Sequence, residues 1–180
     1  MPAYVAFLRA INLGASRKFP KDAIRAAVEA AGGSNVETYI NTGNVLLTTS
    51  LRSRARVETV LEEAFAADRG FEVPTIVFTL AELRQVAADA ADLAAGTGGQ
   101  GRHYVSLLKE TPSGAQVREA EAVDHPGERL VVRGRAVHLM LVGPDGYHLA
   151  RLGNAFVEKR LGVATNRNLT VIRALADRWC

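Results

Sequence analysis

Three short polar segments of this chain carry residue types that could contact a ligand. In the first, Arg9 ends an otherwise apolar run and is followed by Asn12 and Gly14. An arginine at this point places a donor where a buried strand opens into a loop, and it gains by meeting an anion or a carboxylate. The alternative is that Arg9 extends its charged end into solvent while its stem stays packed.

The second segment is Asn41-Thr42-Gly43-Asn44, between two stretches rich in β-forming residues. Its amides could face a ligand. The alternative is ordinary turn chemistry, because Asn and Gly supply the backbone conformations that a tight hairpin requires.

The third segment is Thr165-Asn166-Arg167-Asn168, which precedes the last predicted helix. Backbone N–H groups at a helix start and a guanidinium can bind an anion together. The alternative is plain capping of the helix by Thr165 or Asn168.

We therefore expect a ligand site built from all three segments, with Arg9, Asn44 and Arg167 facing one pocket that binds small anions. No His, Cys, Asp or Glu accompanies them as a proton-transfer group, so catalytic residues are not assigned. The candidate ligand-binding residues are Arg9, Asn12, Asn44, Thr165, Arg167 and Asn168.

Other motifs favour structural roles. The glycine-rich stretch at 96–101 lacks the strand–loop–helix context of a phosphate-binding loop, and it is typical of a linker. The four histidines form no i,i+4 pair, and His138 is interpreted as a packed, hydrogen-bonded histidine of an apolar strand. We expect no metal and no cofactor.

Composition bounds the class of protein. The 180 residues are 48% hydrophobic, with 22 basic and 19 acidic residues and a net charge of +3. The six basic and two acidic residues from Arg151 onward predict a local positive field. Cys180 is the lone cysteine, which fits a reducing compartment, and no leader is expected. No apolar run approaches the ~20 residues of a membrane span. We therefore expect a cytoplasmic protein without a membrane partner.

Hydrophobic periodicity predicts how the first half positions these segments. A nearly continuous apolar run at 4–11, interrupted by Arg9, is typical of a central strand buried on both faces. Pro74 near the start of a later strand indicates an edge or entry position. The predicted order is βαββαβ, with strands at 4–11, 35–41, 45–49 and 73–79, helices at 21–31 and 53–69, and an extra helix at 81–93.

The second half repeats this pattern, with a helix where a fourth strand would stand. We expect an α+β fold of two ferredoxin-like subdomains with antiparallel sheets, ordered βαββαβ and βαββαα. The expected division is 1–94, a glycine-rich linker at 95–102, and 103–180. In the second half the strands are predicted at 103–109, 128–133 and 136–142, and the helices at 113–123, 150–161 and 168–179.

The three polar segments also carry a family resemblance. The stretches YVAFLRAINLG, TYINTGNV and GNAFVEKRLGVATNRN resemble the bacterial family known as domain of unknown function 1697, from Tyr4 to about Leu175. The resemblance implies two related ferredoxin-like subdomains and no particular activity. The chain departs from the family pattern at Ala10 and Ala15, where glycines are usual, at Thr42 in place of Ser, and at Leu169 near a usual Trp.

Three functions remain open. The first is a binding protein for a small anionic ligand, meaning phosphate, a nucleotide or a nucleic-acid backbone. The second is a small-molecule enzyme with a cleft between the subdomains, and the third is a protein-interaction module without a ligand. Sequence-specific RNA binding is not expected, because the aromatic residues Phe7, Tyr39, Phe78 and Tyr104 occur singly in apolar strands.

Overall fold

The computed structural model describes residues 1–95, 102–142 and 146–180. The chain forms two compact units, Met1–Leu83 with Trp179, and Arg84–Arg178 with Cys180. Helix α3 (Leu80–Ala95) belongs to the second unit from Arg84 onward, although the sequence assigns it to the first subdomain. The expected linker lies almost wholly outside the described residues, so the division at 95–102 stays a prediction.

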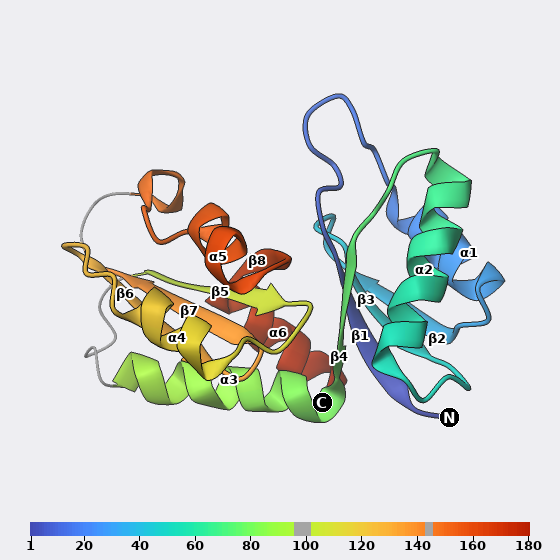
Figure 1. Cartoon of the computed structure of the whole chain (residues 1–180). Coiled ribbons are helices and arrows are strands. Elements are labelled where there is room, and N and C mark those ends of the chain that lie inside the picture. Colours follow the sequence, from blue (N-terminus) through green and yellow to red (C-terminus); the bar gives the residue numbers. More distant parts are fainter. Residues whose placement is uncertain (96–101, 143–145) are drawn as a thin grey trace. The chain divides into compact units, whose positions relative to one another are not determined.

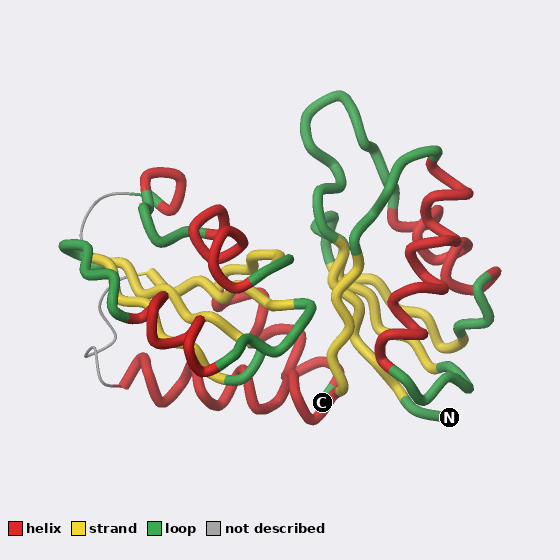
Figure 2. The backbone as a smooth tube through the Cα atoms, in the orientation of Figure 1, coloured by secondary structure: helices red, strands yellow, loops and turns green. Residues whose placement is uncertain are grey.

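The first unit is a four-stranded antiparallel sheet in the order β2-β3-β1-β4, with helices α1 and α2 on one face (Figures 1 and 2). The predicted βαββαβ order is confirmed. Its elements are β1 (Ala3–Leu8), α1 (Lys21–Ala30), β2 (Ser34–Tyr39), β3 (Asn44–Thr48), α2 (Arg54–Arg69) and β4 (Thr75–Thr79).

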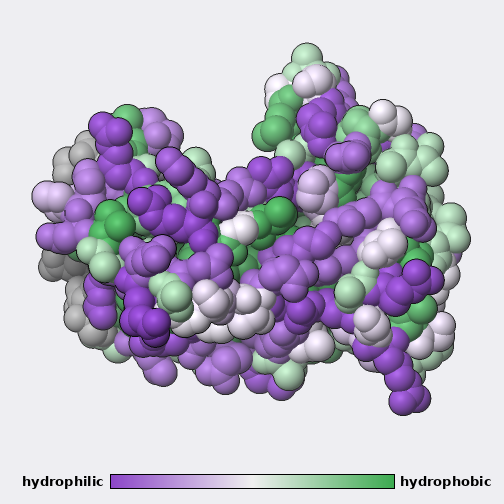
Figure 3. Space-filling view, viewed as in Figure 1, coloured by the Kyte–Doolittle hydropathy of each residue, from purple (hydrophilic) through white to green (hydrophobic). Residues whose placement is uncertain are grey.

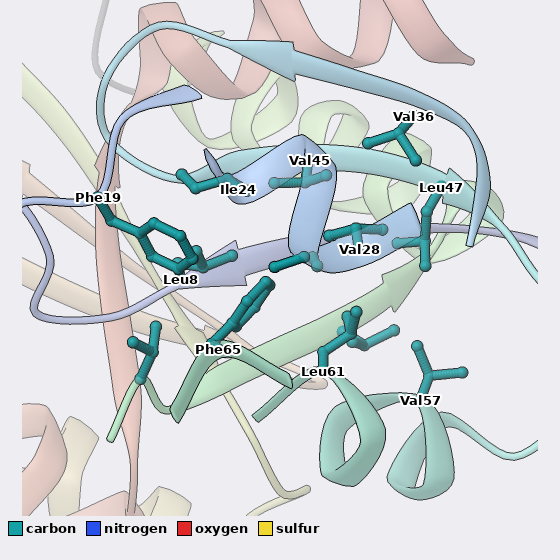
Figure 4. Close-up of a cluster of buried hydrophobic side chains, with 14 of the residues drawn as sticks. Leu8, Phe19, Ile24, Val28, Val36, Val45, Leu47, Val57, Leu61 and Phe65 are labelled. Atoms are coloured by element: carbon teal, nitrogen blue, oxygen red, sulfur yellow. The ribbon is translucent and has the colours of Figure 1, made fainter. Parts of the chain in front are cut away.

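The core of the first unit lies between the sheet and these two helices. Strand β1 is central, and its residues from Tyr4 to Leu8 are all buried, as the continuous apolar run predicts. Phe19 packs edge-to-face on Phe65 with ring centroids 5.2 Å apart, beside Leu8 (Figure 4). This core anchors the end of β1 from which the first polar segment departs.

Strand β4 is an edge strand, as Pro74 indicates, and its outward N–H groups are covered by carboxylates. Such cover matters because unpaired edge groups invite pairing with other chains. Three glutamates accept the hydrogen bonds: Glu62 from Thr75, Glu58 from Val77 and Glu82 from Thr79.

The second unit repeats the sheet topology in the order β6-β7-β5-β8, again antiparallel. Two ferredoxin-like subdomains are therefore present, as predicted. The elements after α3 are β5 (Arg102–Leu108), α4 (Gly114–Glu121), β6 (Glu128–Arg133), β7 (Ala136–Leu141), a 3₁₀ turn (Tyr147–Leu149), α5 (Asn154–Leu161), β8 (Ala164–Asn168) and α6 (Leu169–Trp179).

The order βαββαα predicted for this half is wrong at one element. Residues Ala164–Asn168 form the fourth strand, which pairs with β5 through Thr165 opposite Leu107 and Arg167 opposite Val105. The stretch is short and polar, so propensity and hydrophobic pattern favour a loop. Pairing with a buried neighbour outweighs that weak local preference.

The second sheet packs helices on both of its faces. Leu108, Leu139 and Val157 belong to a core formed with α4 and α5. On the opposite face, Leu93 of α3 packs with Val131 and Met140. None of the helices in the described ranges combines the length and apolar character needed to cross a bilayer.

Candidate functional site

The loop at residues 9–20 joins β1 to α1 and projects beyond the strands of the first unit (Figures 1 and 2). We call it the basic loop. Residues 9–25 contain five basic residues and one acidic residue, whereas residues 26–83 contain four basic and eight acidic residues. The positive charge of this unit is therefore concentrated on one loop and the start of the helix that follows it.

Asn12 closes the basic loop and ties it to the turn between β2 and β3. Its Oδ1 accepts a hydrogen bond from the Phe19 N–H at 2.8 Å. Its Nδ2 donates to the carbonyl oxygens of Asn41 at 2.8 Å and of Phe19 at 3.3 Å. The first two polar segments are thus brought together within the first unit, with Asn12 as the link.

The backbone of the basic loop takes an unusual course. Ala10, Asn12, Gly14 and Arg17 all have positive φ, between 54° and 61°. This region costs L residues energy, and a segment holds it only when surrounding contacts impose it. The loop is therefore a specified conformation held by its hydrogen bonds.

Arg17 supplies further bonds and was not singled out from the sequence. Its Nε donates to the Ala10 carbonyl at 2.6 Å, its guanidinium also donates to the Glu72 carbonyl, and it lies 4.6 Å from the Phe71 ring centroid. Lys18 and Lys21 on the same stretch are exposed, and Arg9 is half-buried. The density of basic residues between 9 and 25 was the sequence signal for this cluster.

The hairpin turn at residues 40–43 uses its amides for turn chemistry. Asn44 is fully buried, and its Nδ2 donates to the Tyr39 carbonyl at 3.0 Å and to Thr42 Oγ1 at 2.9 Å. Gly43 has φ 74°, and its carbonyl accepts from the Leu8 N–H at 2.8 Å. The turn is therefore hydrogen-bonded to the end of β1, directly before the basic loop begins.

Thr165, Arg167 and Asn168 lie in the second unit, on β8. Arg167 is 7% exposed, and burial lowers the pKa of its guanidinium to about 10. Its Nη1 donates hydrogen bonds to Thr165 Oγ1 at 2.9 Å and to the Asn166 carbonyl at 2.8 Å. Asn168 Oδ1 accepts from the Val171 N–H at 2.9 Å, so Asn168 caps α6, which was one of the two capping residues considered. A common pocket for Arg9, Asn44 and Arg167 stays a prediction.

His138 is packed and hydrogen-bonded, as predicted, and its partner is a second histidine. His138 is fully buried, and its Nδ1 lies 3.0 Å from Nε2 of His103. Burial lowers the pKa of both rings, to about 4 for His103 and about 3 for His138. Within residues 1–95, 102–142 and 146–180, no group of three or more His, Cys, Asp or Glu side chains could hold a metal.

Two cavities of the described residues contain none of the candidate ligand-binding residues. One, of about 110 Å³, lies beside His125, Glu128 and Arg151. Glu128 in its wall is engaged, because its carboxylate accepts from the N–H groups of Arg151 and Leu152 at 2.8 Å. The other lies near the N-terminus, between Met1 and Arg52.

A solved structure shares the fold of the whole chain. The conserved bacterial protein SP0830 from Streptococcus pneumoniae superposes with a TM-score of 0.75 at 22% sequence identity. The match covers 98% of this chain and 97% of that one. At this identity the likeness shows the fold alone.

Family membership rests on the sequence. No curated protein matches the chain significantly. The family described as "Protein of unknown function (DUF1697)" matches residues 1–138, a range that includes the basic loop and the hairpin turn. The chain belongs to this DUF1697 family.

Proposed function

We propose that this protein binds an anionic ligand through the basic loop. The observation that carries the proposal is the separation of charge within the first unit, with five basic residues and one acidic residue at 9–25 against four and eight at 26–83. A local positive field of this kind attracts anions and raises their rate of encounter.

The conformation of the loop supports the proposal. A ligand that meets a flexible loop must order it, and that ordering lowers affinity. Here Asn12 and Arg17 already hold the loop through side-chain bonds to four backbone carbonyls. Asn12 is therefore proposed as a positioning residue of the loop, and Asn44 as a positioning residue of the turn to which Asn12 is bonded.

The contacts with the ligand are assigned to the basic side chains. Lys18 and Lys21 are exposed, and Arg9 is the first residue of the loop. Helix α1 begins after Pro20 without a side-chain cap, so its first N–H groups add a favourable dipole for negative charge. Phosphate, a nucleotide or a nucleic-acid backbone would satisfy these groups. Thr165, Arg167 and Asn168 make bonds within the second unit and are not required.

Thermal shift at low ionic strength tests the proposal. Inorganic phosphate, ATP and oligothymidylate should each raise the melting temperature of the unmodified protein, less so as salt increases. Lys18→Glu and Lys21→Glu should abolish the shift. Arg56→Glu changes an exposed basic residue on α2 and serves as the matched control. The proposal would be wrong if none of the three anions raised the melting temperature, or if Arg56→Glu lost the rise to the same extent as the two lysine variants.

The expected cytoplasmic location is part of the same proposal, since the lone Cys180 is typical of a reducing compartment. Fractionation of the native host with a reporter fused to the chain would test it.

A further inference from the structure

Two large apolar side chains are exposed on the basic loop and the hairpin turn. Leu13 is 57% exposed and Ile40 is 41% exposed. Each is the sequence neighbour of a residue in the Asn12–Asn41 hydrogen bond of 2.8 Å, so they lie on the two segments that this bond joins. The space-filling view shows hydrophobic surface among hydrophilic residues on the projecting loop (Figure 3).

Ile40 is held in a costly conformation. Its φ is 49°, in the left-handed region that β-branched residues rarely enter. Asn or Gly would fit this turn position with less strain. Neither core packing nor turn chemistry accounts for an exposed isoleucine at a strained position, and strained residues of this kind cluster at functional sites.

The neighbouring charges decide what kind of molecule that is. A nucleic-acid backbone would use the lysines and arginines but would leave Leu13 and Ile40 without a role. Single-stranded binding surfaces present exposed aromatic side chains for stacking. Within residues 9–20 and 40–43 the aromatic residue is Phe19, which is buried in the core. The neighbouring Tyr39 and Phe71 are half-buried, and Arg17 lies over the Phe71 ring. Apolar side chains surrounded by basic residues fit a polypeptide partner instead.

We propose that Leu13 and Ile40 form the apolar centre of a docking surface for an acidic polypeptide segment with apolar anchor residues, supplied by another protein. The inference rests on the proposed function, because the basic loop contributes the charge that complements the segment. Leu13 and Ile40 insert between apolar side chains of the partner. Lys18 and Lys21 pair with its carboxylates at the rim.

Two labelled synthetic peptides of equal length and charge test this by fluorescence anisotropy. One contains Glu and Leu, and the other contains Glu and Ser. The Glu/Leu peptide should bind the unmodified protein about tenfold more tightly, since burying the exposed part of a leucine contributes about that factor. Leu13→Ser should remove this advantage and leave Glu/Ser binding unchanged. Leu149→Ser removes a leucine that is 58% exposed in the second unit and should change neither affinity.

Ile40→Asn provides a second readout. It should raise the melting temperature by relieving strain and also weaken binding of the Glu/Leu peptide. A role confined to the fold would not yield this opposite pair of effects.

Equal affinities for the two peptides, with the phosphate shift retained, would overturn the docking inference and leave the proposed function standing. Oligothymidylate that binds more tightly than either peptide and is unaffected by Leu13→Ser would also overturn it, in favour of nucleic acid. Loss of phosphate and peptide binding alike would overturn both.

Discussion

His103 and His138 share one hydrogen bond of 3.0 Å on neighbouring strands of the second sheet. The remaining ring nitrogens, His103 Nδ1 and His138 Nε2, are buried and have no hydrogen-bond partner among the described residues. Whichever ring donates, one buried donor and one buried acceptor remain. The pair is therefore a buried polar defect, and its burial disfavours added charge on either ring.

This pair predicts loss of stability on acidification. Burial lowers the pKa of His103 to about 4, with repulsion from Arg173 adding to it, and the pKa of His138 to about 3, with repulsion from His103 and Arg133 adding to it. Between the ordinary value near 6.5 and these folded values, the unfolded chain binds more protons, so the free energy of unfolding falls as pH drops below about 6.5. Melting temperatures measured from pH 7.5 to pH 4 should show this fall.

The double variant His103→Phe/His138→Phe keeps two rings in contact and removes both titrating groups. Its melting temperature should depend less on pH over the same range. An identical pH profile in the variant and the unmodified protein would show that other groups cause the loss.

Asn12→Ala should loosen the basic loop. It removes two hydrogen bonds to Phe19 within the loop and one to Asn41, 29 residues away, and about 1–2 kcal/mol of unfolding free energy is expected to be lost in urea denaturation. Limited proteolysis should cut within residues 9–20 sooner. Ser16→Ala, which removes one long contact to the Leu13 carbonyl within the same loop, should have little effect.

Gly43→Ala should destabilise far more than Gly14→Ala, although both glycines have positive φ. A Cβ at Gly14 meets nothing within 4 Å, so the cost is the backbone strain alone, roughly 1–2 kcal/mol. A Cβ at Gly43 would lie 2.7 Å from Leu8 Cβ and 2.9 Å from Ile11 Cδ1, which adds overpacking of roughly 1–3 kcal/mol. Equal urea midpoints for the two variants would contradict this packing.

Glu58→Ala should expose the β4 edge. The substitution leaves the Val77 N–H without its 2.9 Å acceptor at a buried position, at a cost of about 1–3 kcal/mol. The variant should also aggregate more readily on heating, followed by light scattering, because an uncovered edge can pair with other chains. Glu63→Ala, at an exposed position on the same helix, is the control and should match the unmodified protein.

Local chemistry determined most of the architecture. The apolar run at 4–11 predicted a central strand because such a strand is buried on both faces, and the strand observed there is β1, which ends at Leu8. Thr42-Gly43 predicted the hairpin turn, and Ser53 predicted the start of α2, where its side chain accepts from the Arg56 N–H. These features depend on neighbours within a few residues, which a sequence displays directly.

Tertiary structure decided the fourth strand of the second sheet, the role of Asn12 and the histidine pair, because the residues that contact one another there lie far apart along the chain. Strand β8 exists through its pairing with β5, some 60 residues earlier at Ser106 and Asn166. Asn12 was selected as a ligand contact and proved to be bonded to Asn41, 29 positions away. His103 and His138 meet because strand register places them on one face, and no local pattern encodes that register. A polar residue in the sequence indicates that its side chain needs a hydrogen-bond partner. The fold decides whether that partner is a ligand or another part of the same chain.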